Sequence, residues 1–128
     1  MTVDDLREPT LLILAALATQ PRHGYALIEA VAELSEGRVR LKAGSLYATL
    51  DRLAREGLVA ESGSEVVAGR HRRYYALTGS GVEVLSAQTA RLQALAAATA
   101  AAVREHRRTR SGEDRSNAVD VRWAGGPA

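Results

Sequence analysis

The chain is 128 residues long, carries a formal net charge of +2 and has apolar side chains at 46% of its positions. This length suits one domain with a short extension, and the apolar content excludes a chain that is disordered throughout. The absence of cysteine excludes disulfides and thiolate metal sites and suits a reducing cytoplasm, where we expect the protein to act. The apolar segment 11–18 is too short to cross a bilayer, so we expect no membrane partner.

Apolar residues at helical spacing predict two helices near the start of the chain. Pro9 is suited to a first helical turn, and the apolar run over 11–18 predicts a widely buried helix behind it. The proline and glycine within 20–24 break this pattern. A second helix is expected over 24–34, because its apolar residues recur at helical spacing: Leu27, Ile28, Val31 and Leu34.

The third helix has the clearest pattern. It is expected to begin near 44–45, with Ser45 as its cap, and to end at Gly57. Its inward face is defined by leucines spaced by four and three residues, Leu46, Leu50 and Leu53. Its other face is narrow, small and polar, and comprises Ser45, Ala48, Thr49, Arg52 and Glu56.

The period of the pattern changes after the third helix. Segments 58–61 and 66–67 on one side, and 74–77 on the other, predict two short strands. The stretch between them is rich in Gly, Ser, Glu and Arg, so we expect a β-hairpin with a polar loop that contains the arginines.

A long helix is expected to follow the hairpin. Thr78 or Ser80 is its predicted cap, and Ser80 with Glu83 forms a predicted capping box. We therefore expect three parts, which are a domain at 1–79, a helix at 80–108, and a flexible tail at 109–128 in which Trp123 lies.

The order helix, helix, helix, hairpin, helix is that of a winged helix-turn-helix domain. The major groove of B-DNA is about 12 Å wide and accepts one helix, which must be held by a small core and expose no bulky apolar face. The segment 45–55 meets these conditions, and the arginines of the hairpin lie where a wing meets phosphates or the adjacent minor groove. The predicted fold class is mostly helical with a small β-hairpin: a winged helix-turn-helix domain plus a long C-terminal dimerisation helix.

The chain resembles the PadR-like family of transcription regulators over residues 8–108. The resemblance is carried by several correctly spaced fragments: His23-Gly24-Tyr25, Gly44-Ser45-Leu46-Tyr47 with Leu50 and Leu53, Glu56-Gly57-Leu58, Gly69-Arg70, Arg72, Tyr75, Leu77-Thr78 and Gly81. The single helix after the hairpin is similar to the smaller subgroup of the family. Two positions depart from it, because Ala48 and His71 stand where the family often has proline.

The resemblance implies a homodimeric repressor of transcription that binds double-stranded DNA at a roughly palindromic operator and is relieved by an effector or signal. A small-molecule effector is therefore a candidate partner. Some relatives hold flat aromatic compounds between their subunits, but the final helix here contains no aromatic residue. We therefore expect a narrow or closed dimer interface without a stacking site.

Seven residues are predicted to contact DNA, and they are Lys42, Ser45, Tyr47, Thr49, Arg52, Arg70 and Arg72. Arg52 is the preferred base reader, because a bidentate arginine recognises guanine. The alternatives are that the polar face of the third helix is merely solvated and that Tyr47 packs against the wing. In the wing, Arg70 and Arg72 alternate with His71 and Arg73, so one pair is expected to face DNA, and we expect the first.

Apolar residues of the final helix would be exposed on a lone helix, which predicts that they are buried against a second subunit. The predicted dimerisation residues, with help from the first helix, are Leu11, Leu14, Leu85, Leu92, Leu95 and Val103. The alternative is a final helix that folds back on its own domain.

An enzyme is not expected. The three histidines, His23, His71 and His106, lie on different predicted elements, and no nucleophile elbow, phosphate loop or paired-carboxylate site is present in the sequence. No cofactor or metal is expected. A MarR-like regulator and a winged-helix protein-interaction module without specific DNA binding stay open as alternative functions. The arginines of the wing argue against the second.

Overall fold

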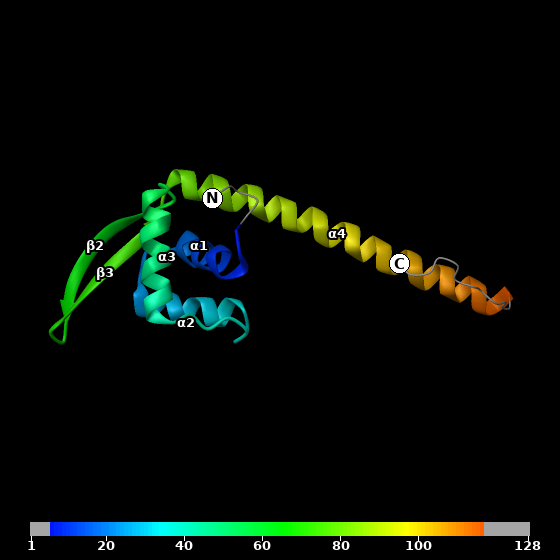
Figure 1. Ribbon diagram of the computed structural model, residues 1–128, viewed down its shortest axis with the longest axis horizontal. Coiled ribbons are helices and arrows are strands. Elements are labelled where there is room, and N and C mark those ends of the chain that lie inside the picture. The colour runs from blue at the N-terminus through cyan, green and yellow to red at the C-terminus, as the bar shows by residue number, and fades with distance from the viewer. Residues whose placement is uncertain (1–5, 117–128) are drawn as a thin grey trace. The chain divides into compact units, whose positions relative to one another are not determined.

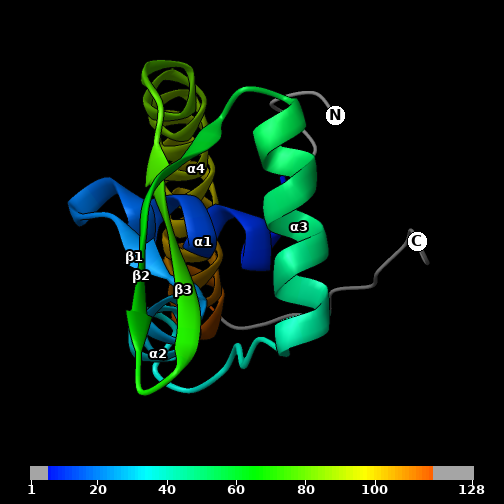
Figure 2. The same cartoon turned by 90° about the vertical axis from the view of Figure 1, so that its left-hand side faces the viewer.

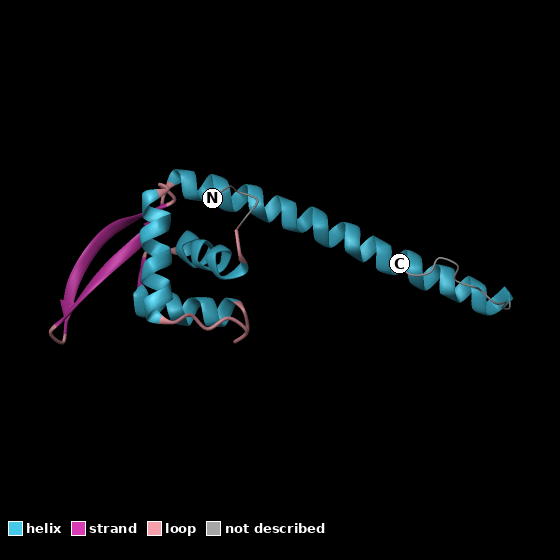
Figure 3. Cartoon of the chain, in the orientation of Figure 1, coloured by secondary structure: helices cyan, strands magenta, loops and turns pink. Residues whose placement is uncertain are grey.

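A computed structural model describes residues 6–116, with side chains as far as residue 112. The element order is α1 (Glu8–Thr19), β1 (Arg22–His23), α2 (Gly24–Leu34), α3 (Ala43–Arg55), β2 (Val59–Val67), β3 (Arg70–Leu77) and α4 (Gly79–Ser116). The predicted class is confirmed, since helices predominate and the strands form one small antiparallel sheet in the order β1-β3-β2 (Figure 3).

The first two helices form where the apolar spacing predicts them. Pro9 lies in the first turn of α1. Helix α2 spans the expected residues, and its N-cap is His23, whose Nδ1 accepts a hydrogen bond from the Ala26 amide at 3.3 Å. The two-residue strand β1, which was not expected, pairs Arg22 with Tyr75 and His23 with Tyr74. It therefore attaches the start of α2 to the sheet.

Helix α3 begins at Ala43, so Ser45 lies inside its first turn and is not the cap that we expected. At the other end, Gly57 adopts a φ of +78°, as predicted for the residue that ends the helix. The Gly57 amide donates to the Ala54 carbonyl and the Leu58 amide to the Leu53 carbonyl. This Schellman arrangement satisfies the last carbonyls of α3 and directs the chain into β2.

The hairpin is longer than the sequence predicted, and the arginines are not in its loop. Strands β2 and β3 are joined by only two residues, Ala68 and Gly69, with φ values of +52° and +78°. Two successive positive φ values are those of a type I′ turn, whose twist matches that of the strands it joins. Arg70 to Arg73 therefore belong to β3. The hairpin projects beyond α1, α2 and α3 (Figure 1).

A network around Thr78 closes the base of the hairpin. The Thr78 hydroxyl accepts from the Gly81 amide at 3.0 Å, which caps α4, and donates to the Gly57 carbonyl at 2.6 Å. Ser80 lies inside the helix, so the predicted capping box of Ser80 and Glu83 is wrong. A Cβ atom at Gly81 would clash with the Leu58 carbonyl, so glycine permits this close approach.

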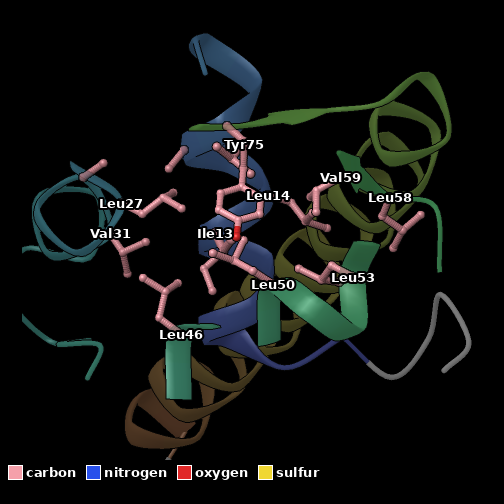
Figure 4. Close-up of a cluster of buried hydrophobic side chains, with 13 residues drawn as sticks. Ile13, Leu14, Leu27, Val31, Leu46, Leu50, Leu53, Leu58, Val59 and Tyr75 are labelled. Carbon is pink, nitrogen blue, oxygen red and sulfur yellow. The ribbon is translucent and has the colours of Figure 1, made fainter. Parts of the chain in front are cut away.

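The buried cluster joins α1, α2, α3 and the sheet (Figure 4). Its largest fully buried side chains are Ile13, Leu14, Leu27, Val31, Leu46, Leu50, Leu53 and Val59. The three leucines of α3 point into it as predicted. Tyr75 contributes from β3 with 3% of its surface exposed.

The chain divides into two units, one that ends at Ala90 and one that begins at Arg91. Helix α4 continues to Ser116, past the end near 108 that we expected, so residues 109–116 are helical rather than part of a tail. The remainder of the expected tail, 117–128 with Trp123, lies outside the described residues.

Candidate nucleic-acid interface

A concavity of about 850 Å³ lies between the start of α2, the first turns of α3 and the hairpin. The residues that line it are His23, Gly24, Tyr25, Ile28, Ala43, Tyr47, Val67, Ala68, Arg70, His71, Arg72 and Arg73. Figure 2 shows α3 and the hairpin side by side on this face of the first unit. Three arginines and no acidic side chain occur among these described residues, so the concavity is suited to a polyanion.

Tyr47 packs across the start of α2. A Cβ atom built at Gly24 would clash with the Tyr47 hydroxyl and the ring carbon that bears it, so only glycine leaves room for the ring. The side chain still has 43% of its surface exposed and lines the concavity. Tyr47 therefore packs against the start of α2 while part of its side chain faces the concavity.

His23 and Tyr25 line the same concavity, although we did not predict a site there. The His23 Nδ1 caps α2, which in the neutral ring places the proton on Nε2. The His23 ring also contacts that of Tyr74 edge to face, with centroids 5.2 Å apart. Tyr25 has 67% of its surface exposed. The available sequence signal for the capping role of His23 was its position directly before Gly24, the first residue of α2.

The two faces of β3 differ in how their arginines are engaged. Arg73 shares a face with Tyr75 and forms a 3.4 Å ion pair with Glu61. On the other face, the Tyr74 hydroxyl donates to Glu65 at 2.6 Å, and this hydrogen bond raises the pKa of Tyr74. Arg70 and Arg72 form no ion pair with any described residue. They are therefore the free cations of this strand in the part of the chain that the structure describes.

The outward face of α3 is rotated from the one that the sequence suggested. Lys42 and Ser45 are exposed, but Thr49 and Arg52 are half-buried. The Arg52 Nε atom is buried and has no hydrogen-bond partner among the described residues. At 3.6 residues per turn, these two side chains lie on the flank opposite Tyr47, and neither lines the concavity.

The predicted dimerisation residues fall into two groups. Leu92, Leu95 and Val103 have 41%, 60% and 48% of their surface exposed, while Leu11 and Leu85 are half-buried. Leu14 has no exposed surface and belongs to the internal cluster. The predicted contact of Leu14 with a second subunit does not fit this structure, because α1 directs the Leu14 side chain into the buried cluster of the same chain.

Among residues 6–116, no three His, Cys, Asp or Glu side chains are grouped as a metal ion would require. No helix in the same described range is long and apolar enough to cross a membrane.

These features define a class of protein, the winged-helix transcription regulators with a long helix after the wing. Within that class, the chain belongs to the transcriptional regulator PadR-like family, whose model matches residues 13–87. Members of this family are transcriptional regulators rather than enzymes. A search of curated proteins finds no significant match.

Solved structures of the same family share the fold. A PadR family regulator from Clostridium difficile is 22% identical, with a TM-score of 0.65 over 76% of this chain and 99% of its own. One from Eggerthella lenta is 26% identical, with a TM-score of 0.60 over 75% and 84% of the two chains. A PadR-like regulator from Bacillus cereus is 22% identical, with a TM-score of 0.61 over 73% and 88%.

Proposed function

We propose that the protein is a homodimeric repressor that binds double-stranded DNA in a sequence-specific manner. The observation that carries this proposal is the concavity beside α3, which is lined by three arginines and by no described acidic side chain. Family membership supports it, since the family regulates transcription.

In the proposed complex, α3 enters the major groove and the hairpin contacts the backbone or the adjacent minor groove. Arginines at the rim of a groove neutralise phosphates and release counterions, which supplies affinity for any duplex. The proposed contacts are those predicted from the sequence: Lys42, Ser45, Tyr47, Thr49, Arg52, Arg70 and Arg72. The half-burial of Thr49 and Arg52 makes them the weakest of these.

The proposed dimer uses the apolar stripe of α4. Leu85, Leu92, Leu95 and Val103 lie on one side of the helix at 3.6 residues per turn. Thr99 lies on the same stripe. Its hydroxyl donates to the Leu95 and Ala96 carbonyls at 3.1 Å, so this polar group is satisfied within the helix. A second α4 would cover this stripe, and Leu11 would add to the interface from α1.

A symmetric dimer would place two α3 helices in successive major grooves, about 34–36 Å apart, on a roughly palindromic operator. Occupation of that operator would block access of RNA polymerase to the promoter. An effector or signal would relieve repression. Helix α4 carries no aromatic residue, so the proposed interface offers no stacking site for a flat aromatic ligand.

The experiment is a salt series of DNA binding by fluorescence anisotropy, with Arg70→Ala and Arg72→Ala. Each variant should lose affinity for all duplexes and reduce the slope of log K against log salt by about one, because one phosphate contact is lost. Arg104→Ala, which removes an exposed arginine of α4, is the matched control and should keep the wild-type slope. Unchanged slopes in both wing variants would refute the wing contact.

A further inference from the structure

The most exposed line of α3 does not include the residues that the sequence singled out. Gly44, Ala48, Asp51 and Arg55 are all exposed and are spaced by four, three and four residues. This line runs opposite the buried Leu46, Leu50 and Leu53. In the proposed complex, this line is therefore the part of α3 that enters deepest into the major groove.

Its first two members allow a close approach. Gly44 has no atom within 4 Å of the place where a Cβ would be, so the space in front of the first turn is open. Ala48 presents only a methyl group. Small residues here let the backbone approach the base edges, and the next two side chains, Asp51 and Arg55, then reach them.

Asp51 and Arg55 are both exposed and can reach a partner, although the Asp51 carboxylate also acts electrostatically on Arg73 of β3. They are four residues apart on one helix face, yet they form no ion pair or side-chain hydrogen bond with each other or with any other described residue. Arg52 differs, because it is half-buried and its Nε is buried without a hydrogen-bond partner among the described residues. A bidentate contact to guanine needs two accessible guanidinium nitrogens, and the exposed Arg55 is better placed to offer them than the half-buried Arg52.

The carboxylate is the more informative of the two groups. It repels backbone phosphates, so Asp51 on this line weakens binding to every duplex unless a base amino group meets it. The amino group that acidic side chains recognise in the major groove is N4 of cytosine. Residues four apart are separated by about 6 Å along the helix axis, which spans about two base pairs.

We propose that Asp51 and Arg55 are specificity-determining residues of α3, with Asp51 accepting from a cytosine N4 amine and Arg55 donating to a guanine within two base pairs of it. This assignment rests on the proposed DNA-binding function. It moves base reading from Arg52 to the next arginine of the helix.

The test is selection of preferred sites from a randomised duplex pool by the full-length wild-type protein and by four variants. Arg55→Ala should lose the guanine preference, and Asp51→Ala the cytosine preference. Each loss should amount to between about five-fold and a hundred-fold in discrimination, as for a single base contact. Asp51→Asn should change the cytosine to adenine, because a carboxamide pairs with adenine. Arg52→Ala, with the same charge change in the same helix, tests the competing base reader. It should weaken binding to every duplex, as the loss of a phosphate contact does, but should return the wild-type motif.

The outcomes separate this inference from the function on which it rests. A wild-type motif that survives unchanged in the Asp51 and Arg55 variants overturns the inference and leaves specific DNA binding intact. A motif altered by Arg52→Ala but not by Arg55→Ala overturns it as well. No motif from the wild-type protein overturns both. All five proteins should have the same thermal unfolding midpoint, because the four substitutions change surface or half-buried polar side chains.

Discussion

The two units of the chain bury their side chains in opposite ways. The unit that ends at Ala90 contains the buried apolar cluster, which gives its helices a common core. In the unit that begins at Arg91, every described side chain is exposed as far as residue 112. Most helical stability in proteins comes from packing of an apolar face, so the second unit lacks the support that the first supplies for itself. We therefore predict that the stability of the second unit depends on a surface outside that unit, which the proposed dimer would supply.

The largest expected effect follows from a charge on the exposed stripe. Leu95→Glu should increase the dissociation constant of the proposed dimer by at least about a hundredfold, because two leucines lose burial worth about 1.5–3 kcal/mol each. Sedimentation equilibrium measures this dissociation constant. Ala97→Glu adds the same charge on the opposite side of α4 and should leave the dimer intact. Equal behaviour of the two variants would refute the stripe as the interface.

The corresponding substitution in the first unit creates a cavity in its buried cluster. Leu50 has no exposed surface, so Leu50→Ala should lower the free energy of unfolding by about 2–5 kcal/mol, as measured in urea. The dimer dissociation constant should stay the same, which distinguishes this substitution from Leu95→Glu. Leu50→Met, which nearly keeps the volume, should cost less than about 1.5 kcal/mol. A change in dimerisation with Leu50→Ala would mean that the two units are not separable in this way.

A smaller effect is expected at the contact of α2 with α3. Gly24→Ala would press a methyl group against the Tyr47 ring, so that either Tyr47 moves or overpacking costs about 1–3 kcal/mol. We expect weaker DNA binding in the anisotropy assay. Gly79→Ala, where a Cβ meets open space, is the control and should bind as the wild type does. Full affinity in Gly24→Ala would show that the position of Tyr47 is unimportant for DNA.

The smallest expected effect is the loss of the α4 cap. Thr78→Ala removes the hydroxyl that joins the Gly57 carbonyl to the Gly81 amide and should lower stability by about 0.5–2 kcal/mol. Thermal unfolding measures the loss, and Thr78→Ser, which keeps the hydroxyl, should restore most of it. A Thr78→Ala variant as stable as the wild type would show that water replaces the cap.

Much of the first unit could be predicted because its signals are local and strong. The spacing of Leu46, Leu50 and Leu53 predicted the inward face of α3, and Gly57 its end. The outward face of α3 was harder to predict. The three leucines define the buried line, but both polar flanks of the helix are equally compatible with that line. The partial burial of Arg52 on one flank, and the exposure of Asp51 and Arg55 between the flanks, depend on neighbours that are remote in sequence.

Other features had no usable local signal. The turn at Ala68 and Gly69 lacks the Asn-Gly or Asp-Gly pair that marks a type I′ hairpin, because an alanine occupies the first left-handed position. Strand β1 has two residues, too few for any alternation to be read. The role of Gly24 depends on Tyr47, which is 23 positions later in the sequence, so only the folded chain shows it.

The central claim is specific DNA binding by a dimer, and one titration tests it most directly. The duplex recovered by selection and a scrambled duplex of the same composition are titrated by fluorescence anisotropy at physiological salt, with the stoichiometry taken at saturation. Our account predicts that the selected duplex binds at least about a thousandfold more tightly, with two chains per site. Equal affinity for the two duplexes, or one chain per site, would contradict it.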